Sequence, residues 1–478
     1  MNIQRRFLLL YAAVAVMLIQ SAVAQDAIQT VSSTADQQER LAITIYNNNL
    51  GLVKEVREIE LPQQELKINF MDVASSIIPS SVHVKSLADP NKFIVLEQNY
   101  EYDLISHAKL MDKYVGKDVK LIFKSEYDGT EEQRDAVLLS NNGGSVYKIG
   151  EEIHLGFPGR VILPKIPENL LARPTLVWMV DNRTTGPQNI EVSYLTNGIS
   201  WYCDYVMILN QADTRIDLAG WVTISNNSGG SFNNAVIKLV AGDVRRVEPE
   251  ADKAMGYEVA MMAPRAAKQF QEESFFEYHL YTLQRPATIK ENQMKQILLM
   301  EASDVPVEKK LMTYGQSHLY TSIYSDPIKD VDVNVSLEFV NSEKNNLGMP
   351  LPKGLIRVYK ADSSDMLQFV GENTIKHTPK DEKIELNIGK AFDVVAERKQ
   401  LNWVKIRKDL YEVEWEMTVR NHKEEDVTVT AQESIPGEWS ILETTHPYEK
   451  IASQTVHFSI PVKANGESVL RYKAQLKF

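Results

Sequence analysis

The chain has 478 residues, of which 44% are hydrophobic and 24% charged, and its formal net charge is −12 at pH 7. This acidic balance disfavours binding to nucleic acid and to anionic membrane surfaces. A single cysteine excludes an internal disulfide framework, and the apolar content is sufficient to build packed cores.

The first residues carry the three parts of a secretory signal peptide. Arg5 and Arg6 precede an apolar run, and Ala22-Val23-Ala24 forms a small-residue cleavage site. The run from Phe7 to Ile19 is shorter than the roughly 20 residues that a membrane-spanning helix needs. We therefore predict a signal peptide over residues 1–24, cleavage near Ala24, and a periplasmic or secreted protein with no transmembrane segment.

The N-terminal half changes from patternless to alternating sequence. Residues 25–40 are polar and without a pattern, which predicts a flexible leader. Alternation of apolar and polar residues then predicts an N-terminal β domain over residues 41–165. Within this domain, residues 115–163 contain short alternating runs separated by Gly and Asn turns, which predict a small SH3-like barrel of five strands.

The rest of the chain repeats one loose pattern, in which two alternating runs flank an Asn, Asp or Gly turn. This pattern predicts hairpins of a first sandwich part over residues 166–247 and of a second part over residues 275–478. Residues 248–274 are rich in Ala, Met and charge, and predict a mobile loop that is available for docking. The predicted fold is therefore mainly β and multidomain, with Ig-like β-sandwich domains.

Several segments resemble a known family. "TNGISWYCDY" (196–205), "LAGWVTISNNSG" (218–229) and the C-terminal "SIPVKANGESVLRYKAQLKF" resemble exported bacterial proteins whose C-terminal part is a domain of unknown function. The same domain occurs in proteins named for mucoidy inhibition. The resemblance covers residues 41–478 and implies an all-β exported protein, but it implies no catalytic residues.

The lone cysteine is the first candidate for chemistry. A strand through "SWYCDYVM" places Trp201, Cys203, Tyr205 and Met207 on one apolar face. Burial among aromatic residues raises the pKa of a thiol and makes it unreactive. We therefore predict that Cys203 is a core residue and not a nucleophile.

Metal and catalytic motifs are missing from the sequence. The nine histidines include no HxH, HxxxH or HExxH spacing. Asp330, Asp332 and Asn334 alternate with valines but lack the Gly and Glu of a calcium loop, which favours the polar face of a strand. GxSxG and phosphate-binding glycine motifs are absent as well. We therefore predict no catalytic, cofactor or metal residues and no cofactor.

The aromatic residues divide into two groups by their position in the pattern. Strand-like runs contain four tryptophans and one tyrosine that we predict to be core, namely Trp178, Trp201, Trp221, Trp415 and Tyr320. Trp403 and Trp439 lie near strand ends or turns, so we predict that they are exposed aromatics that bind a partner.

These features favour a non-enzymatic, β-rich envelope protein that binds or organises a protein or glycan partner. Two alternatives stay open. One is a hydrolase that acts on envelope polymers or peptides at an inter-domain cleft, where two carboxylates, or a His with a carboxylate, would have to meet. The other is adhesion through open sheet edges, where a strand of a partner adds to the sheet.

Overall fold

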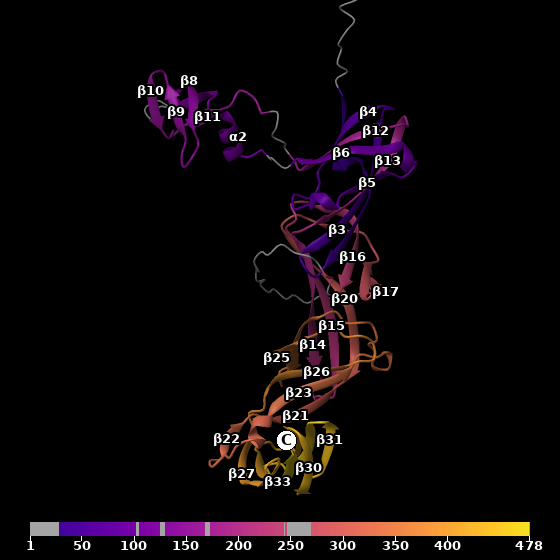
Figure 1. The fold of residues 1–478 in the computed structure, drawn as a ribbon, viewed down its shortest axis with the longest axis vertical. Coiled ribbons are helices and arrows are strands. Elements are labelled where there is room, and N and C mark those ends of the chain that lie inside the picture. The colour runs from indigo at the N-terminus through magenta and orange to yellow at the C-terminus, as the bar shows by residue number, and fades with distance from the viewer. Residues whose placement is uncertain are drawn as a thin grey trace, which may run out of the picture.

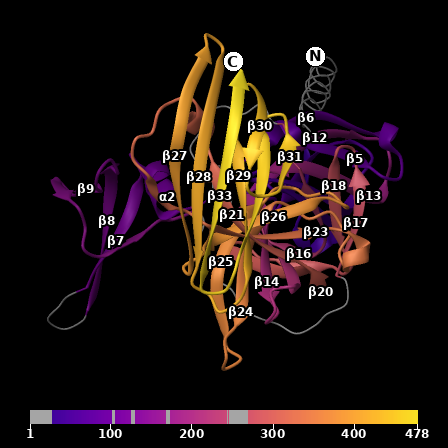
Figure 2. The same cartoon turned by 90° about the horizontal axis from the view of Figure 1, so that it is seen from below.

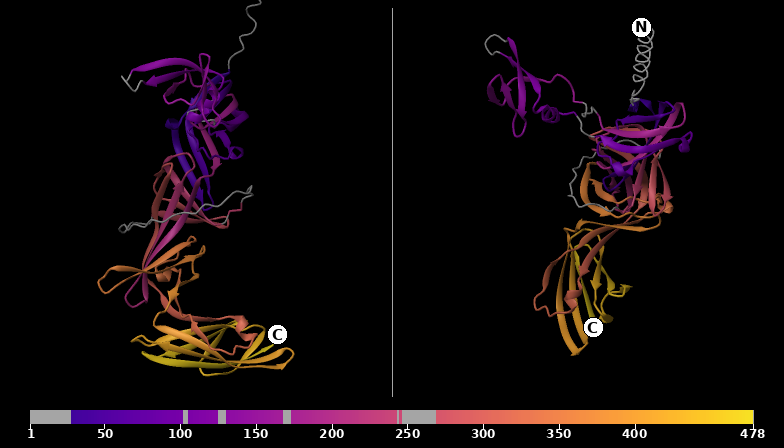
Figure 3. Two further views of the ribbon diagram at one scale, coloured as in Figure 1. Left: turned by 90° about the vertical axis from the view of Figure 1, so that its left-hand side faces the viewer. Right: turned by 45° about the horizontal axis from the view of Figure 1, so that its top comes forward.

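The computed structural model describes residues 28–101, 105–124, 130–167, 173–242, 244–245 and 269–477. Nearly all of the regular elements are strands, and they form six sheets. Figures 1 and 3 show most of the sheets following one another along the long axis of the molecule. The predicted mainly β, multidomain sandwich architecture is thereby confirmed. None of the helices in these ranges is long and apolar enough to cross a membrane.

The described part of the predicted leader, residues 28–40, contains regular structure. Gln29–Ser33 form strand β1, Ala35–Gln37 form a 3-10 helix, and β2 (Gln38–Tyr46) begins directly afterwards. Strand β1 pairs in parallel with β4 (Glu65–Met71) through its backbone. Backbone pairing needs no apolar pattern, which is why the polar composition hid the strand. The predicted signal peptide, residues 1–24, lies outside the described residues.

Two sheets form the N-terminal part of the molecule. The first has the order β1-β4-β12-β6. It adds strands β12 (Thr175–Asn182) and β6 (Phe93–Glu101). The second has eight strands in the order β17-β18-β16-β2-β3-β13-β5, with β19 paired to β16. Its strands besides β2 are β17 (Phe270–Phe275), β18 (Tyr278–Leu283), β16 (Phe232–Ala241), β3 (Leu50–Leu61), β13 (Gly186–Thr196), β5 (His83–Ser86) and β19 (Ala287–Ile289).

The sheets do not follow the predicted domain boundary at residue 165. Strand β2 pairs in parallel with β16, and β3 pairs along its length with β13. Both partners come from the segment that was predicted to form a separate sandwich part. The long-range pairing of β2 and β3 therefore builds one sheet from both segments.

The predicted small barrel is an open sheet with five strands. Its order is β10-β9-β8-β7-β11, so β10 and β11 are edges in the described residues. The strands are β7 (Asp118–Lys124), β8 (Glu131–Ser140), β9 (Val146–Ile149), β10 (Glu152–Leu155) and β11 (Arg160–Ile162). Helix α2 (His107–Tyr114) contributes Met111 and Tyr114 to its core and covers the apolar side that closure would have buried. Figure 1 shows this unit lying to one side of the column of sheets.

The middle of the molecule contains a sheet with the order β20-β15-β14-β24-β25. Its strands are β20 (Gln293–Pro306), β15 (Arg215–Asn226), β14 (Ile199–Leu209), β24 (Gly354–Ala361) and β25 (Leu367–Ile375). Strands β14 and β24 are parallel, which joins segments that lie far apart in the chain. The inner face of β14 belongs to one large core that also includes residues of the N-terminal sheets.

The C-terminal part is a sandwich of two sheets around its own core. One sheet consists of β26 (Lys383–Lys390), β23 (Asn334–Val340), β21 (Glu308–Gly315), β29 (Val427–Ser434), β32 (Thr455–Val462) and β31 (Tyr448–Ala452). The other consists of β22 (Ile328–Val331), β27 (Val394–Arg407), β28 (Leu410–Asn421), β33 (Gly466–Lys477) and β30 (Glu438–Thr444). The remaining 3-10 helices are Pro79–Ser81, Pro90–Lys92, Ser317–Tyr320 and Glu343–Asn345.

Two further segments differ from their predictions. Most of the predicted mobile loop over 248–274 lies outside the described residues, but its last residues belong to β17, which pairs with β18. The stretch predicted to present Asp330, Asp332 and Asn334 from a single strand is broken between β22 and β23. Asp330 has a φ of 59°, and this left-handed conformation interrupts the extended backbone.

Candidate functional site

Cys203 lies in the core, as predicted. It is 1% exposed, and Trp201, Tyr205 and Met207 on the same face of β14 are buried with it. Burial raises the pKa of the Cys203 thiol to about 12. A thiol that stays protonated near neutral pH is a poor nucleophile. Cys203 is therefore a packing residue of the large core.

Most of the aromatics predicted to be core are buried. Trp178, Trp201, Trp415 and Tyr320 are almost fully buried, whereas Trp221 is half-buried. The indole N–H of Trp178 donates a hydrogen bond to the Gln98 side chain at 3.0 Å, and that of Trp201 donates to the carbonyl of Val240 at 3.2 Å.

Trp403 and Trp439, the predicted partner-binding residues, are both half-buried and pack against the C-terminal core. Trp403 donates its indole N–H to the carbonyl of Tyr320 at 3.4 Å, and Trp439 donates to the carbonyl of Ser453 at 2.8 Å. The ammonium of Lys450 lies 4.3 Å from the ring centre of Trp439. The two residues are fixed by these contacts, and their role in binding stays a prediction.

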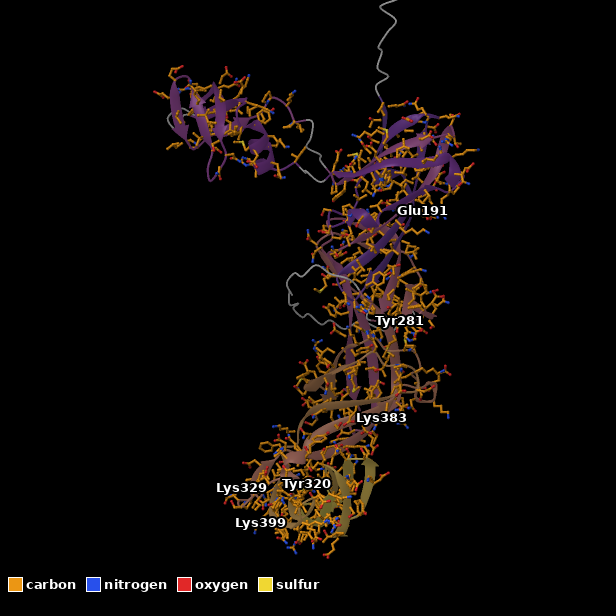
Figure 4. The ribbon with its side chains drawn as sticks, viewed as in Figure 1. Glu191, Tyr281, Tyr320, Lys329, Lys383 and Lys399 are labelled. Carbon is orange, nitrogen blue, oxygen red and sulfur yellow. The ribbon has the colours of Figure 1, made fainter. Side chains whose placement is uncertain are left out.

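A charged cluster is buried between the sheets of the C-terminal sandwich. The guanidinium of Arg398 makes two hydrogen bonds to the Glu433 carboxylate, at 2.9 and 3.2 Å. The Tyr320 hydroxyl donates to Glu433 at 2.8 Å and lies 2.7 Å from the Tyr472 hydroxyl. Figure 4 places Tyr320 within this sandwich. Strands β27, β29 and β33 and the 3-10 helix Ser317–Tyr320 are thereby joined.

Burial and mutual charge shift the pKa values in this cluster. Burial alone would lower the pKa of Arg398, but the facing Glu433 carboxylate outweighs it and the pKa is raised. Burial, and then the charge of Glu433, raise the pKa of the Tyr320 hydroxyl well above its usual value. Tyr320 therefore stays neutral and Arg398 stays charged, which suits a structural role better than proton transfer.

A pocket of about 360 Å³ opens beside this cluster. Its polar lining includes Arg398, His318 and Asp332. Asp332 forms an ion pair with Lys390 at 2.8 Å, and the His318 ring packs 6.4 Å from the ring of Tyr324. These contacts differ from the hydrogen-bonded His–carboxylate pair that a hydrolase uses.

Other histidine contacts are local. His279 on β18 lies 2.8 Å from Glu272 on the neighbouring strand β17, and His154 lies 3.3 Å from Glu152. Among the described residues, no three His, Cys, Asp or Glu side chains gather closely enough to hold a metal ion.

Another pocket, of about 370 Å³, lies in the small five-stranded unit. Helix α2 and strand β11 line it mainly with apolar side chains, among them Leu110, Met111 and Val161. His107 and Lys165 add the polar groups. This composition provides a hollow for apolar groups and no acid–base pair.

The most exposed apolar surface of the middle sheet lies on the β24–β25 hairpin. Its exposed side chains are Met366 (59%), Leu367 (40%), Phe369 (56%) and Val370 (40%), which we call the hairpin patch. The Phe369 ring packs edge-on against Tyr359 of β24, with 5.8 Å between ring centres. Figure 2 shows the hairpin extending beyond the neighbouring sheets. Leu367 and Phe369 share one face of β25, and exposed apolar side chains that lie together mark interaction surfaces.

The turn of this hairpin is held by Asp362. Its carboxylate accepts hydrogen bonds from the backbone N–H groups of Ser364 and Met366, at 2.8 and 3.1 Å. A hydrogen bond from the Gln368 side chain lowers the pKa of Asp362 most, and these two backbone bonds lower it further. The patch is therefore presented on a formed turn. Sequence reasoning missed the patch, although the run Met366–Val370 contains no charge and four apolar residues in five positions.

Comparison with known proteins adds the family. No curated protein matches the chain. Residues 190–478, which include the hairpin patch and the buried charged cluster, match the domain of unknown function DUF4139. This match spans more than half of the chain, and the chain therefore belongs to the DUF4139 family.

Proposed function

We propose that this chain is an exported, β-rich envelope protein that binds and organises a protein partner and catalyses no reaction of its own. The hairpin patch carries the proposal, because exposing several neighbouring apolar residues to water is unfavourable unless a partner covers them. The secretory features of residues 1–24 support export to the periplasm or beyond. The resemblance to proteins named for mucoidy inhibition supports a role in the envelope.

A protein fits the patch better than a glycan. Sugar recognition combines aromatic stacking with many polar groups. Phe369 is the one ring among the four patch residues, and Met366, Leu367 and Val370 offer neither rings nor hydrogen-bonding groups. The hydrolase alternative receives less support from the contacts of His318 and Asp332 in the C-terminal pocket. Partner binding by Trp403 and Trp439 would add a second contact region in the C-terminal sandwich.

The test is crosslinking in intact producing cells. Wild type is compared with Leu367→Lys/Phe369→Lys, which places charge on the patch, and with Phe392→Lys as the matched control. Phe392 is 92% exposed and lies outside the patch. We expect a defined crosslinked protein species that the double variant loses and Phe392→Lys keeps. Equal crosslinking by all three proteins would overturn the proposal, as would turnover of an envelope polymer by the purified protein.

A further inference from the structure

Strand β25 is a free sheet edge in the described part of the chain. It pairs with β24 and ends the order of its sheet. Strand β26 approaches the second half of β25, where the Asn373 side chain donates to the carbonyl of Asn387 at 2.8 Å. The first half, with Leu367 and Phe369, is the exposed part. Its outward backbone groups are therefore available to another strand.

Charge is missing from the exposed first half of this edge, in contrast to the edge strands β17 and β31. Edge strands in natural proteins are protected by charged residues, and β17 and β31 follow this rule with Glu272, Glu273, Glu449 and Lys450. The run Met366–Val370 has none. An uncharged, apolar edge is the type that pairs with another strand.

The sequence of this edge is complementary to itself. When two copies run antiparallel about Gln368, Leu367 faces Phe369 and Met366 faces Val370. The charged residues that flank the run lie outside this ladder, because Asp362 and Asp365 belong to the hairpin turn and Glu372 follows the bulge at Val370. Apolar cross-strand pairs stabilise a sheet and like charges directly opposite destabilise it.

We propose that the partner of the hairpin patch is a second copy of this chain, bound by antiparallel pairing of the two β25 strands about Gln368. The proposal rests on the function proposed above and names its partner. The two middle sheets then form one continuous sheet, and the exposed apolar groups cover each other. A β-bulge at Val370, where the register to β24 shifts, limits the length of the ladder. The dimer is therefore small, reversible and dependent on concentration.

The first test is disulfide trapping with Gln368→Cys under a mild oxidant. The two thiols face each other in this register, and the native Cys203 does not compete because it is buried and its pKa is raised. Thr374→Cys is the matched control, because it is exposed on the same strand but lies far from its own copy in this register. We expect a covalent dimer with Gln368→Cys alone. Equal trapping of both variants would overturn the register.

The second test is sedimentation equilibrium of the purified protein. We expect wild type and Phe392→Lys to dimerise, and Leu367→Lys/Phe369→Lys to stay monomeric because lysines then face lysines. Mixing the lysine variant with Leu367→Glu/Phe369→Glu should give a heterodimer, because lysines then face glutamates. Circular dichroism verifies that each variant is folded.

Two results would overturn the inference: a wild type that is monomeric at every concentration, or a dimer that persists in the lysine variant. A monomeric wild type leaves the proposed function standing if the lysine variant still loses its crosslinked partner in cells. Both proposals would be rejected if the wild type is monomeric and the lysine variant is crosslinked in cells as strongly as the wild type.

Discussion

Arg398 and Glu433 form an ion pair that is almost completely removed from water, with side-chain exposures of 3% and 0%. Such a pair is costly to bury, and its members depend on each other. Gly315 of β21 leaves the space for the carboxylate, because a Cβ at that position would collide with Glu433. The cluster therefore fixes how the two sheets of the C-terminal sandwich sit on each other.

Removing one member of this pair should destabilise the protein strongly. Arg398→Met leaves the Glu433 carboxylate buried without its counter-charge, and we expect a loss of about 3–5 kcal/mol in the free energy of unfolding. Urea unfolding followed by tryptophan fluorescence measures it. Arg420→Met is the control, since Arg420 pairs with Glu397 at the surface and exposed pairs contribute about 0–1 kcal/mol. Similar losses in both variants would contradict a special role of the buried pair.

Cys203 provides a prediction about reactivity and alkaline stability. The thiol of the folded chain keeps its proton up to about pH 12, whereas an unfolded thiol loses it near 9.0. The folded state therefore binds more protons between these values, and the contribution of Cys203 to stability is lost as the pH rises through this window.

We expect native protein to be inert to Ellman's reagent at pH 8 and to react with one equivalent after unfolding in guanidinium, since the chain has one cysteine. The stability difference between wild type and Cys203→Ala should shrink above about pH 9. Rapid labelling of the native protein, or a difference that grows with pH, would contradict the burial of the thiol.

At the level of elements, the β17–β18 hairpin holds a bulky residue in an unfavourable backbone conformation. Phe276 has a φ of 57° at the turn and is 82% exposed. The left-handed region costs a residue with a side chain about 1–2 kcal/mol, and glycine adopts it freely. The exposed ring packs against Tyr278, with 6.0 Å between ring centres, which offsets part of this cost.

Phe276→Gly should therefore stabilise the protein, by about 1 kcal/mol after the entropy cost of glycine is subtracted. The neighbouring Phe275→Gly is the control, because Phe275 has no left-handed φ and glycine there only loosens a strand. Thermal unfolding should show a higher Tm for Phe276→Gly and a lower one for Phe275→Gly. A fall in Tm for both variants would mean that the ring of Phe276 stabilises the fold.

Individual elements were readable from the sequence wherever one face of a strand is buried. The alternation in β14 correctly placed Trp201, Cys203, Tyr205 and Met207 on one buried face. Strand β1 was not predicted, because a short polar edge strand has no such alternation. The pairing of the strands was not predicted either. Alternation shows which face of a strand is buried but not which strand lies beside it, so the parallel pairing of β2 with β16 could not be predicted.

The hairpin patch was not predicted for a related reason. An uncharged apolar run such as Met366–Val370 reads as a buried strand, and its exposure at a free edge follows only from where β24 and β25 lie in the sheet. The two tryptophans predicted to be exposed are half-buried instead. Trp403 and Trp439 lie near turns, but the long hairpin of β27 and β28 and the strand β30 fold them partly onto the C-terminal core.

At the scale of the whole molecule, net charge opposes self-association. The chain has a formal net charge of −12 at pH 7, so two copies repel each other at long range. The proposed β25 interface contains no ion pair that salt could weaken. We therefore expect added NaCl to strengthen the dimer, because screening becomes effective over about 10 Å at 0.1 M. Sedimentation equilibrium at low and high salt measures this, and a dimer that dissociates with salt would point to a charged interface instead.

The small five-stranded unit is an insertion between two neighbouring strands of the N-terminal sheet. Glu101 at the end of β6 and Thr175 at the start of β12 are paired partners, so the chain leaves the sheet and returns at the same place. The unit has a core of its own, built around Met111, Leu121 and Tyr147. Its folding should therefore be largely independent of the rest of the molecule.

Replacing residues 102–174 with an Asn-Gly turn should leave the remaining sheets folded, because this turn joins paired antiparallel strands directly. We expect calorimetry of the wild type to show a separate transition for the small unit, and the shortened protein to lose that transition and keep the main one. Because β25 lies in another sheet, its concentration-dependent dimer should also persist. Loss of the main transition would show that the unit stabilises the N-terminal sheets, and that the column of sheets depends on it.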